Sequence, residues 1–264
     1  MNVKTVGAQI LVFAFFLWMA WALTLAPTSP SSVSCVNCNV IIIGVDTLRA
    51  DRVHSFGYEK ETTPHIDALG DTGFSFTNAV SASSWTVPSF MSILTGAYPS
   101  VHGLINKYVV YDPNNKEQQI ISNLEKISPE IQTLAEALKK VGYATGGFTG
   151  DAGVGHAFGY AKGFDVYTDA KTFGDLEQSQ THALSWLDSL DKNQKFFMFF
   201  HGYDLHGQAL LSQEEKIFVP KDYTGPYTGS PQEEAVLREQ QLHVEGITLT
   251  EEDVAFWNGW YDSK

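Results

Sequence analysis

The sequence predicts an α/β protein built on a mainly parallel sheet, and two short apolar runs are the most direct indication. The first, residues 39–45, reads Asn-Val-Ile-Ile-Ile-Gly-Val, and the second, residues 195–201, reads Lys-Phe-Phe-Met-Phe-Phe-His. Neither run alternates with polar residues, which is typical of a strand covered on both faces in a parallel sheet. Helical patterns lie between the predicted strands, as the crossovers of such a sheet require.

Two helices and one further strand are expected after the first run. Pro64 lies in the first turn of a short helix, a position that proline favours. Residues 74–80 alternate apolar and polar side chains and are predicted to form a strand. Thr86 is the expected N-cap of the next helix, which Gly96 should end.

The second half of the chain alternates strands with helices in the same manner. The expected elements are helix 131–140, strand 142–148, short edge element 163–167, helix 178–190 and a polar surface helix at 233–243. A last helix begins at Thr250, where Thr-Glu-Glu-Asp resembles a capping box with aspartate in place of glutamate.

Composition limits the class of protein. A chain of 264 residues that is 44% hydrophobic can bury one large core, or a core with an appendage. Its net charge of −13 argues against a nucleic-acid binder, because phosphates would find little positive charge to neutralise them. We therefore expect no nucleic-acid partner.

The N-terminal segment differs from the rest. Residues 7–26 form an apolar run of 20 residues, long enough to span a bilayer, with Lys4 before it and no further Lys or Arg until Arg49. This pattern predicts a membrane anchor at 1–26, a linker at 27–38 and a domain at 39–264 outside the cytoplasm. If the segment is a cleaved signal instead, the protein is secreted.

Two cysteines, Cys35 and Cys38, lie at the end of the linker. An exported domain permits a disulfide between them. Their spacing also occurs in redox and metal sites, but a metal site would need partners at comparable spacing that the chain does not offer. A structural pair is the favoured interpretation.

Asp46 is the first candidate functional residue, because it follows directly on the first predicted strand. Ligands of open α/β sheets bind at the carboxyl ends of the strands, where a carboxylate would be available to them. The alternative is that Asp46 caps the next helix. This stretch alone does not distinguish the two.

Several segments in order resemble the sulfatase family of the alkaline-phosphatase superfamily. The resemblance implies an alkaline-phosphatase-like three-layer sandwich, here C-terminally incomplete, because the family completes its metal site with a later Asp-His or Asp-Asn pair. The matching segments are residues 39–51, 58–69, 74–79, 86–103 (Thr-x-Pro-Ser to Tyr-Pro-Ser-x-His-Gly), 134–145, 163–167 and 196–206 (ending His-x-Tyr-Asp-x-His).

Three residues match functional positions of this family. Asp46 matches the first metal ligand, and Thr86 matches the nucleophile, which in sulfatases is a cysteine or serine matured to formylglycine. His206 matches a histidine near the substrate or the leaving group. The resemblance implies a divalent cofactor, Ca²⁺ or Mn²⁺ with Mg²⁺ or Zn²⁺ as alternatives, with Thr86 contributing to the metal site as well.

The chain also departs from the family pattern. Oxidation of Thr86 would give a ketone, so formylglycine cannot form there. Phe90 stands where an arginine is expected, and residues 149–152 replace the Gly-Lys-Trp-His found in many sulfatases. Loss of such cations costs transition-state stabilisation. Lys107 is a candidate replacement cation.

Two further residues are candidates for contact with substrate. His201 lies at the end of the second apolar run, and Asp151 follows the strand predicted at 142–148. Asp151 is a candidate for binding either metal or substrate.

The predicted function is a metal-dependent hydrolase of sulfate esters or related phosphate monoesters and diesters. The superfamily's phosphonate and phosphodiester hydrolases and phosphoglycerol transferases use threonine directly, so a phosphoglycerol- or phosphoethanolamine-type transferase of the cell envelope is the alternative. A catalytically silent domain is a third possibility. The expected substrates are small-molecule, glycan or lipid-linked esters.

Overall fold

The computed structural model describes residues 35, 37–105, 126–151, 153–169, 174–206, 211–212, 214–242 and 248–264. The chain divides into two units, residues 1–38 and 39–264, and every helix and strand below belongs to the second. The predicted membrane segment, most of the linker and Lys107 lie outside the described residues. Cys35 and Cys38 form a disulfide. No helix among the described residues has the length and apolar character to cross a bilayer.

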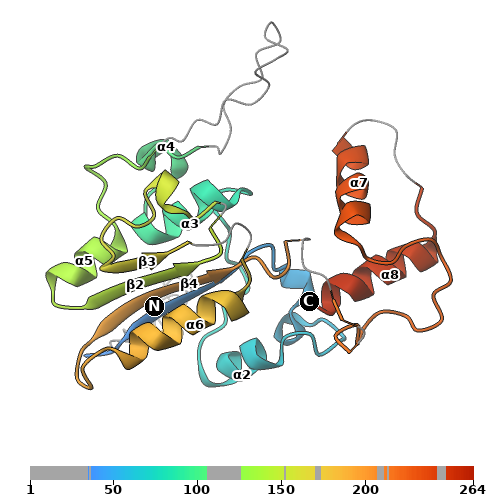
Figure 1. The fold of residues 1–264 in the computed structure, drawn as a ribbon, viewed down its shortest axis with the longest axis horizontal. Helices are drawn as coiled ribbons and strands as arrows, with labels where there is room; N and C mark the ends of the chain where they lie inside the picture. The colour runs from blue at the N-terminus through green and yellow to red at the C-terminus, as the bar shows by residue number, and fades with distance from the viewer. Residues whose placement is uncertain are drawn as a thin grey trace, which may run out of the picture. The chain divides into compact units, whose positions relative to one another are not determined.

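A four-stranded sheet forms the centre of the second unit (Figure 1). Its strands are β1 (Val40–Val45), β2 (Ala144–Thr149), β3 (Val166–Thr168) and β4 (Phe196–Gly202), in the order β1-β4-β2-β3. Every pair is parallel, which confirms the predicted α/β class with a parallel sheet. The carboxyl ends of all four strands therefore meet at one edge.

Helices cover the two faces of this sheet (Figure 1), with α3 and α5 on one face and α6 on the other. The α-helices are α2 (Pro64–Thr72), α3 (Thr86–Thr95), α4 (Pro99–His102), α5 (Leu134–Lys140), α6 (Leu176–Asp188), α7 (Pro231–Leu242) and α8 (Glu251–Asp262). Three single 3₁₀ turns are η1 (Ala50–Arg52), η2 (His54–Phe56) and η3 (His156–Phe158).

The core lies on both faces of β4. Phe197 and Phe199 point to the side of α3, where they join Met91, while Met198 points to the other side and packs near Trp186 of α6. This two-sided burial is what the apolar run predicted.

Strand β1 is buried on one face only, so the prediction of burial on both faces is wrong for it. Val40 and Ile42 pack against the core, but Ile41 and Ile43 are 48% and 55% exposed. The reason is position: β1 is the edge strand of the described sheet, and α6 packs on β2 and β4 instead.

Residues 74–80, which alternate like a strand, form loop and turn instead. Phe74 and Phe76 are exposed, and no strand pairs with them among the described residues. Alternation shows only that one face of a segment is apolar; a strand also requires a neighbour for its backbone.

Helix ends follow the local signals closely. Gly96 ends α3 in the left-handed conformation at φ +66°, as predicted. Thr250 and Asp253 form the predicted capping box of α8, and Thr133 forms another with Glu136 at the start of α5.

Candidate active site

The candidate active site lies where the carboxyl end of β1 meets the first turn of α3. The prediction of Thr86 as the N-cap is wrong: Trp85 is the N-cap, and α3 begins one residue earlier than predicted, with Thr86 as its first residue. The Thr86 side chain does not cap the helix. Its hydroxyl donates a hydrogen bond to Asp46 Oδ2 at 2.8 Å. The Asp46 amide donates to the Gly202 carbonyl at 3.1 Å, which ties this carboxylate to the end of β4.

His201 is the third polar residue of this cluster. It lies opposite Gly44 of β1 in the sheet register and is completely buried. Its Nε2 lies 3.5 Å from Asp46 Oδ2, which is too long for a strong hydrogen bond. Its ring lies between Phe90 and Tyr203, with both ring centroids 4.7 Å away and both rings nearly perpendicular to it.

The carboxylate of Asp46 is held in its charged form. Burial by itself acts to raise the pKa of Asp46, but the polar contacts with His201 and Thr86 oppose it. The nearby imidazole of His206 acts in the same direction, and the pKa of Asp46 is therefore lower than usual. Asp46 is suited to orient a hydroxyl or to hold a cation, and it is a poor store for a proton.

Phe90 occupies the space where the family pattern has an arginine. A Cβ on Gly44 would lie 2.5 Å from Phe90 Cε1 and 3.1 Å from His201 Cδ2. The missing side chain of Gly44 therefore makes room for the phenyl ring beside the imidazole. An apolar ring replaces a cation at this point.

Tyr203 is a neighbour of the cluster that the sequence analysis did not identify. Its hydroxyl accepts from the Gly153 amide at 2.8 Å, and burial raises its pKa. A Cβ on Gly153 would lie 3.1 Å from both Thr86 Cγ2 and the Tyr203 hydroxyl, so the three residues are close together. A sequence signal was available: Tyr203 follows His201 by two residues, and in an extended chain side chains two residues apart lie on the same face.

An open cavity of about 990 Å³ gives access to Asp46 and Thr86, whereas His201 does not line it. Asp46, Thr86 and His206 line it, together with Trp85, which is half exposed. No lysine or arginine lines it within the described part of the chain. Its rim is rich in small hydroxyls, from Ser81, Ser83, Ser84, Ser89 and Ser92.

Asp151 and His102 lie elsewhere. Asp151 does not line this cavity; it follows β2 in a left-handed conformation with φ +58°. His102 is buried and bonded at both nitrogens: Nδ1 accepts from the Leu104 amide, and Nε2 lies 3.1 Å from Ser92 Oγ. His102 therefore stabilises the α3–α4 connection.

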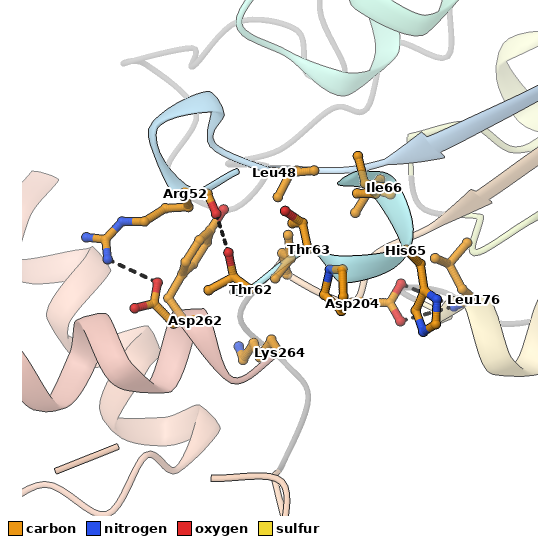
Figure 2. Close-up of a pocket in the computed structure, with 14 residues that line it drawn as sticks. Leu48, Arg52, Thr62, Thr63, His65, Ile66, Leu176, Asp204, Asp262 and Lys264 are labelled. Carbon is orange, nitrogen blue, oxygen red and sulfur yellow. Dashed lines mark hydrogen bonds and ion pairs between the residues drawn. The ribbon is translucent and has the colours of Figure 1, made fainter. Parts of the chain in front are cut away.

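A second, smaller cavity of about 300 Å³ lies near η1 and the start of α6 (Figure 2). Figure 2 shows Asp204 bonded to the backbone of Leu176 at this cavity, and burial raises the Asp204 pKa. The lining is mostly apolar and includes neither Asp46 nor Thr86. It is separate from the candidate nucleophile.

The donors of the cluster fit a divalent cation in part. Asp46 offers a carboxylate oxygen, Thr86 a hydroxyl oxygen and His201 an imidazole nitrogen that has no hydrogen bond among the described residues. In the same residues, no group of three or more His, Cys, Asp and Glu side chains is placed to hold a metal ion. The oxygens of Asp46 and Thr86, which line the open cavity, are therefore the ligands that the described residues offer to an ion.

The sequence matches the family model Sulfatase over residues 38–251. An N-acetylgalactosamine-6-O-sulfatase of Bacteroides thetaiotaomicron is 36% identical over 108 residues, 41% of this chain and 19% of that protein. Arylsulfatase A of Bos taurus is 31% identical over 126 residues, 48% of this chain and 23% of that protein. The matched segments thus cover less than a quarter of these relatives.

Solved structures share the fold at low sequence identity. The phosphonate monoester hydrolase of Agrobacterium radiobacter matches with a TM-score of 0.57 at 17% identity, over 86% of this chain and 56% of that chain. The soluble domain of lipooligosaccharide phosphoethanolamine transferase A of Neisseria meningitidis matches with a TM-score of 0.55 at 16% identity, over 89% of this chain and 59% of that chain. The fold is alkaline-phosphatase-like, and the chain belongs to the sulfatase family.

Proposed function

We propose that this chain carries the nucleophile of a hydrolase of sulfate esters, with Thr86 as the attacking residue. The observation that supports it most is the 2.8 Å hydrogen bond from the Thr86 hydroxyl to Asp46. Thr86 also begins α3, where the partial positive charge of a helix N-terminus favours negative charge on its oxygen. Sulfatase relatives favour a sulfate ester as the substrate.

In the proposed reaction Thr86 Oγ1 attacks sulfur, a new oxygen–sulfur bond forms, and the bond from sulfur to the leaving alcohol breaks. The Thr86 proton leaves along its hydrogen bond to Asp46, and because the Asp46 pKa is low, the proton passes on to solvent. His206, on the wall of the same cavity, gives a proton to the departing oxygen. Water then attacks sulfur and gives a proton to His206, and the bond from sulfur to Thr86 Oγ1 breaks. Sulfate leaves, and Thr86 Oγ1 takes a proton from solvent, which restores its hydroxyl.

The cofactor in this proposal is a divalent ion held by Asp46 and Thr86. Such an ion lowers the pKa of a bound hydroxyl and neutralises charge on the transferred group. Asp46 suits this role because it stays ionised while nearly buried.

Replacing Thr86 tests the proposal. Thr86→Ala removes the nucleophile, and we expect hydrolysis of an aryl sulfate to fall at least about 10³-fold, because the covalent route is closed. Thr86→Ser keeps the hydroxyl and should retain measurable turnover, with a sulfated serine detectable by mass spectrometry. Equal activity of Thr86→Ala and the parent chain would exclude Thr86 as the nucleophile.

A transferase of the cell envelope is the second candidate. One reason is that Thr86 would attack through an unmodified hydroxyl. The other is the structural similarity to phosphoethanolamine transferases. The two candidates differ in the second step, where a transferase would use an acceptor hydroxyl in place of water. Product analysis with a lipid-linked phosphoethanolamine donor and a glycan acceptor separates them.

We also propose that residues 1–26 anchor the protein in a membrane, with the domain outside the cytoplasm and a glycan or lipid-linked ester as its substrate. The support is the apolar run of 20 residues with Lys4 before it. The full chain should stay in the membrane fraction after alkaline carbonate extraction, whereas a chain starting at residue 27 should be released. Release of both would contradict the anchor.

A further inference from the structure

Tyr203 is a buried tyrosine for which the proposed reaction has no role. It follows β4 directly and is 4% exposed. Its ring lies edge-on to two imidazoles, with ring centroids 4.7 Å from His201 and 5.3 Å from His206. Its amide donates to the Gly174 carbonyl at 3.0 Å, and its carbonyl accepts from the His206 amide at 2.9 Å. Both the ring and the backbone of Tyr203 are therefore fixed beside the proposed proton donor.

The hydroxyl end of Tyr203 reaches the proposed nucleophile. It accepts from the Gly153 amide at 2.8 Å. A Cβ on Gly153 would lie 3.1 Å from the Tyr203 oxygen and 3.1 Å from Thr86 Cβ, so both side chains face the same glycine. Burial raises the pKa of Tyr203, and the hydrogen bonds with the Gly153 amide and with the Thr86 side chain act against this rise. Tyr203 is thus in polar contact with Thr86 from behind, since Thr86 lines the open cavity and Tyr203 does not.

The groups at the two ends of this contact decide which hydroxyl donates. A backbone amide can only donate, so the Gly153 amide occupies a lone pair of the Tyr203 oxygen and leaves its proton to be donated. An ionised carboxylate can only accept, and the Thr86 proton is already given to Asp46 at 2.8 Å. The Tyr203 proton is therefore the one that points to Thr86 Oγ1. Hydrogen bonds that run in one direction in this way strengthen one another.

We propose that Tyr203 is a positioning residue for Thr86: its hydroxyl donates to Thr86 Oγ1 and directs the Thr86 proton to Asp46. Tyr203 keeps its own proton throughout. As Thr86 Oγ1 loses its proton it gains negative charge, and a hydrogen bond to a charged oxygen is stronger than one to a neutral hydroxyl. Because the Tyr203 ring also contacts His206, one side chain holds the nucleophile and the proton donor relative to each other. This inference rests on the proposed role of Thr86 and adds a residue to the same site.

The bond can be measured without any turnover, in the full chain with ¹³C-labelled tyrosine. The chemical shift of tyrosine Cζ depends on the hydrogen bonds of the hydroxyl, and contacts with the ring protons of His201 and His206 identify the Tyr203 signal in the parent chain. Thr86→Val keeps the shape of the side chain but removes its hydroxyl, so we expect the Tyr203 signal to move. Thr86→Ser keeps a hydroxyl and should move it much less. The signal of Tyr167 should stay in place in both variants.

Tyr203→Phe gives an independent measurement through the reaction. It removes the hydroxyl and keeps the ring, and we expect kcat for an aryl sulfate to fall at least about tenfold with KM nearly unchanged, because the lost bond is to an oxygen that becomes charged. Tyr167→Phe is the matched control: the Tyr167 hydroxyl donates to the carbonyl of Val154, in the same loop as Gly153, so its loss loosens this loop and leaves the donor to Thr86 in place. Its kcat should stay close to that of the parent chain.

A rescue separates a lost hydrogen bond from a disturbed fold. 3-Fluorotyrosine at position 203 retains the hydroxyl and should restore turnover, whereas Tyr203→Phe should remain slow although circular dichroism shows it folded.

The outcomes separate this inference from the proposed function. If the Tyr203 signal is the same in Thr86→Val and in the parent chain, the bond does not exist and the inference fails, while the role of Thr86 as nucleophile is unaffected. Equal losses of kcat in Tyr203→Phe and Tyr167→Phe would also overturn it, since both would then act through the loop. If Thr86→Ala is as active as the parent chain, the proposed function fails, and a shifted Tyr203 signal in Thr86→Val would still establish the bond.

Discussion

At the scale of single residues, Gly44 controls what lies beside the candidate nucleophile. It is the residue of β1 that faces His201, and only a hydrogen at this position leaves space for the Phe90 ring. A cationic side chain at position 90 would lie next to the His201 imidazole. The space beside His201 is therefore filled by an apolar ring and not by a cation.

Gly44→Ala tests this packing. Alanine in a strand stabilises the fold by roughly 0.5–1 kcal/mol relative to glycine, because it loses less backbone entropy on folding. However, its Cβ would lie 2.5 Å from the Phe90 ring, and this contact must be relieved. Overpacking of this kind costs about 1–3 kcal/mol, so we expect net destabilisation in urea unfolding.

A double-mutant cycle with Phe90→Ala supplies the control for that prediction. Removing the ring removes the clash, so Gly44→Ala should cost much less in the Phe90→Ala background. Additive free energies of unfolding would show that the two residues do not compete for the same space.

The residues of the site differed in how far the sequence revealed them. Asp46 and Thr86 stand at a strand end and a helix start, and both positions can be recognised locally. His201 was expected near the substrate, but it is completely buried between Phe90 and Tyr203, and this packing cannot be recognised from the local sequence. Tyr203 was missed because its partner, Gly153, comes from a loop 50 residues earlier in the chain.

At the scale of elements, the residues that end or cap helices predicted structure more reliably than the pattern of apolar residues predicted strands and their burial. Gly96 ends a helix through a backbone bond to Ser92, and Thr133 and Thr250 begin helices through side-chain-to-backbone bonds three residues apart, so each signal acts within four residues. The alternation of residues 74–80 needed a neighbouring strand, and the pattern carries no information about one. The burial of β1 likewise depends on which strands flank it.

At the scale of the whole molecule, the last helix is joined to the segment that follows β1. Asp262 of α8 accepts from Arg52 at 3.0 Å, from Lys60 at 2.9 Å and from Tyr58 at 2.6 Å. Its side chain is fully buried, and that of Arg52 is nearly so. Figure 2 shows the Arg52–Asp262 pair beside the smaller cavity.

Asp262→Asn should destabilise the fold by roughly 3 kcal/mol, because it leaves two cations facing a site without a compensating charge. Urea unfolding measures the loss, and limited proteolysis should show faster cleavage around α8. Asp51→Asn is the matched control: it breaks an Arg49 pair whose partners are both more than half exposed, and its effect should be near zero. Equal effects of the two substitutions would show that burial of the Asp262 pair contributes nothing.

The same helix holds the turn that carries Asp46. Thr47 adopts φ +59°, a costly conformation for a β-branched residue, and the Tyr261 hydroxyl donates to its carbonyl at 2.7 Å while accepting from the Arg49 amide. Tyr261 follows Thr47 by 214 residues. A nascent chain emerging from the ribosome can pair its first strands long before this tyrosine is synthesised, so the sheet can assemble around a carboxylate that is not yet clamped. The bond that fixes this turn would then form only after the sheet has assembled.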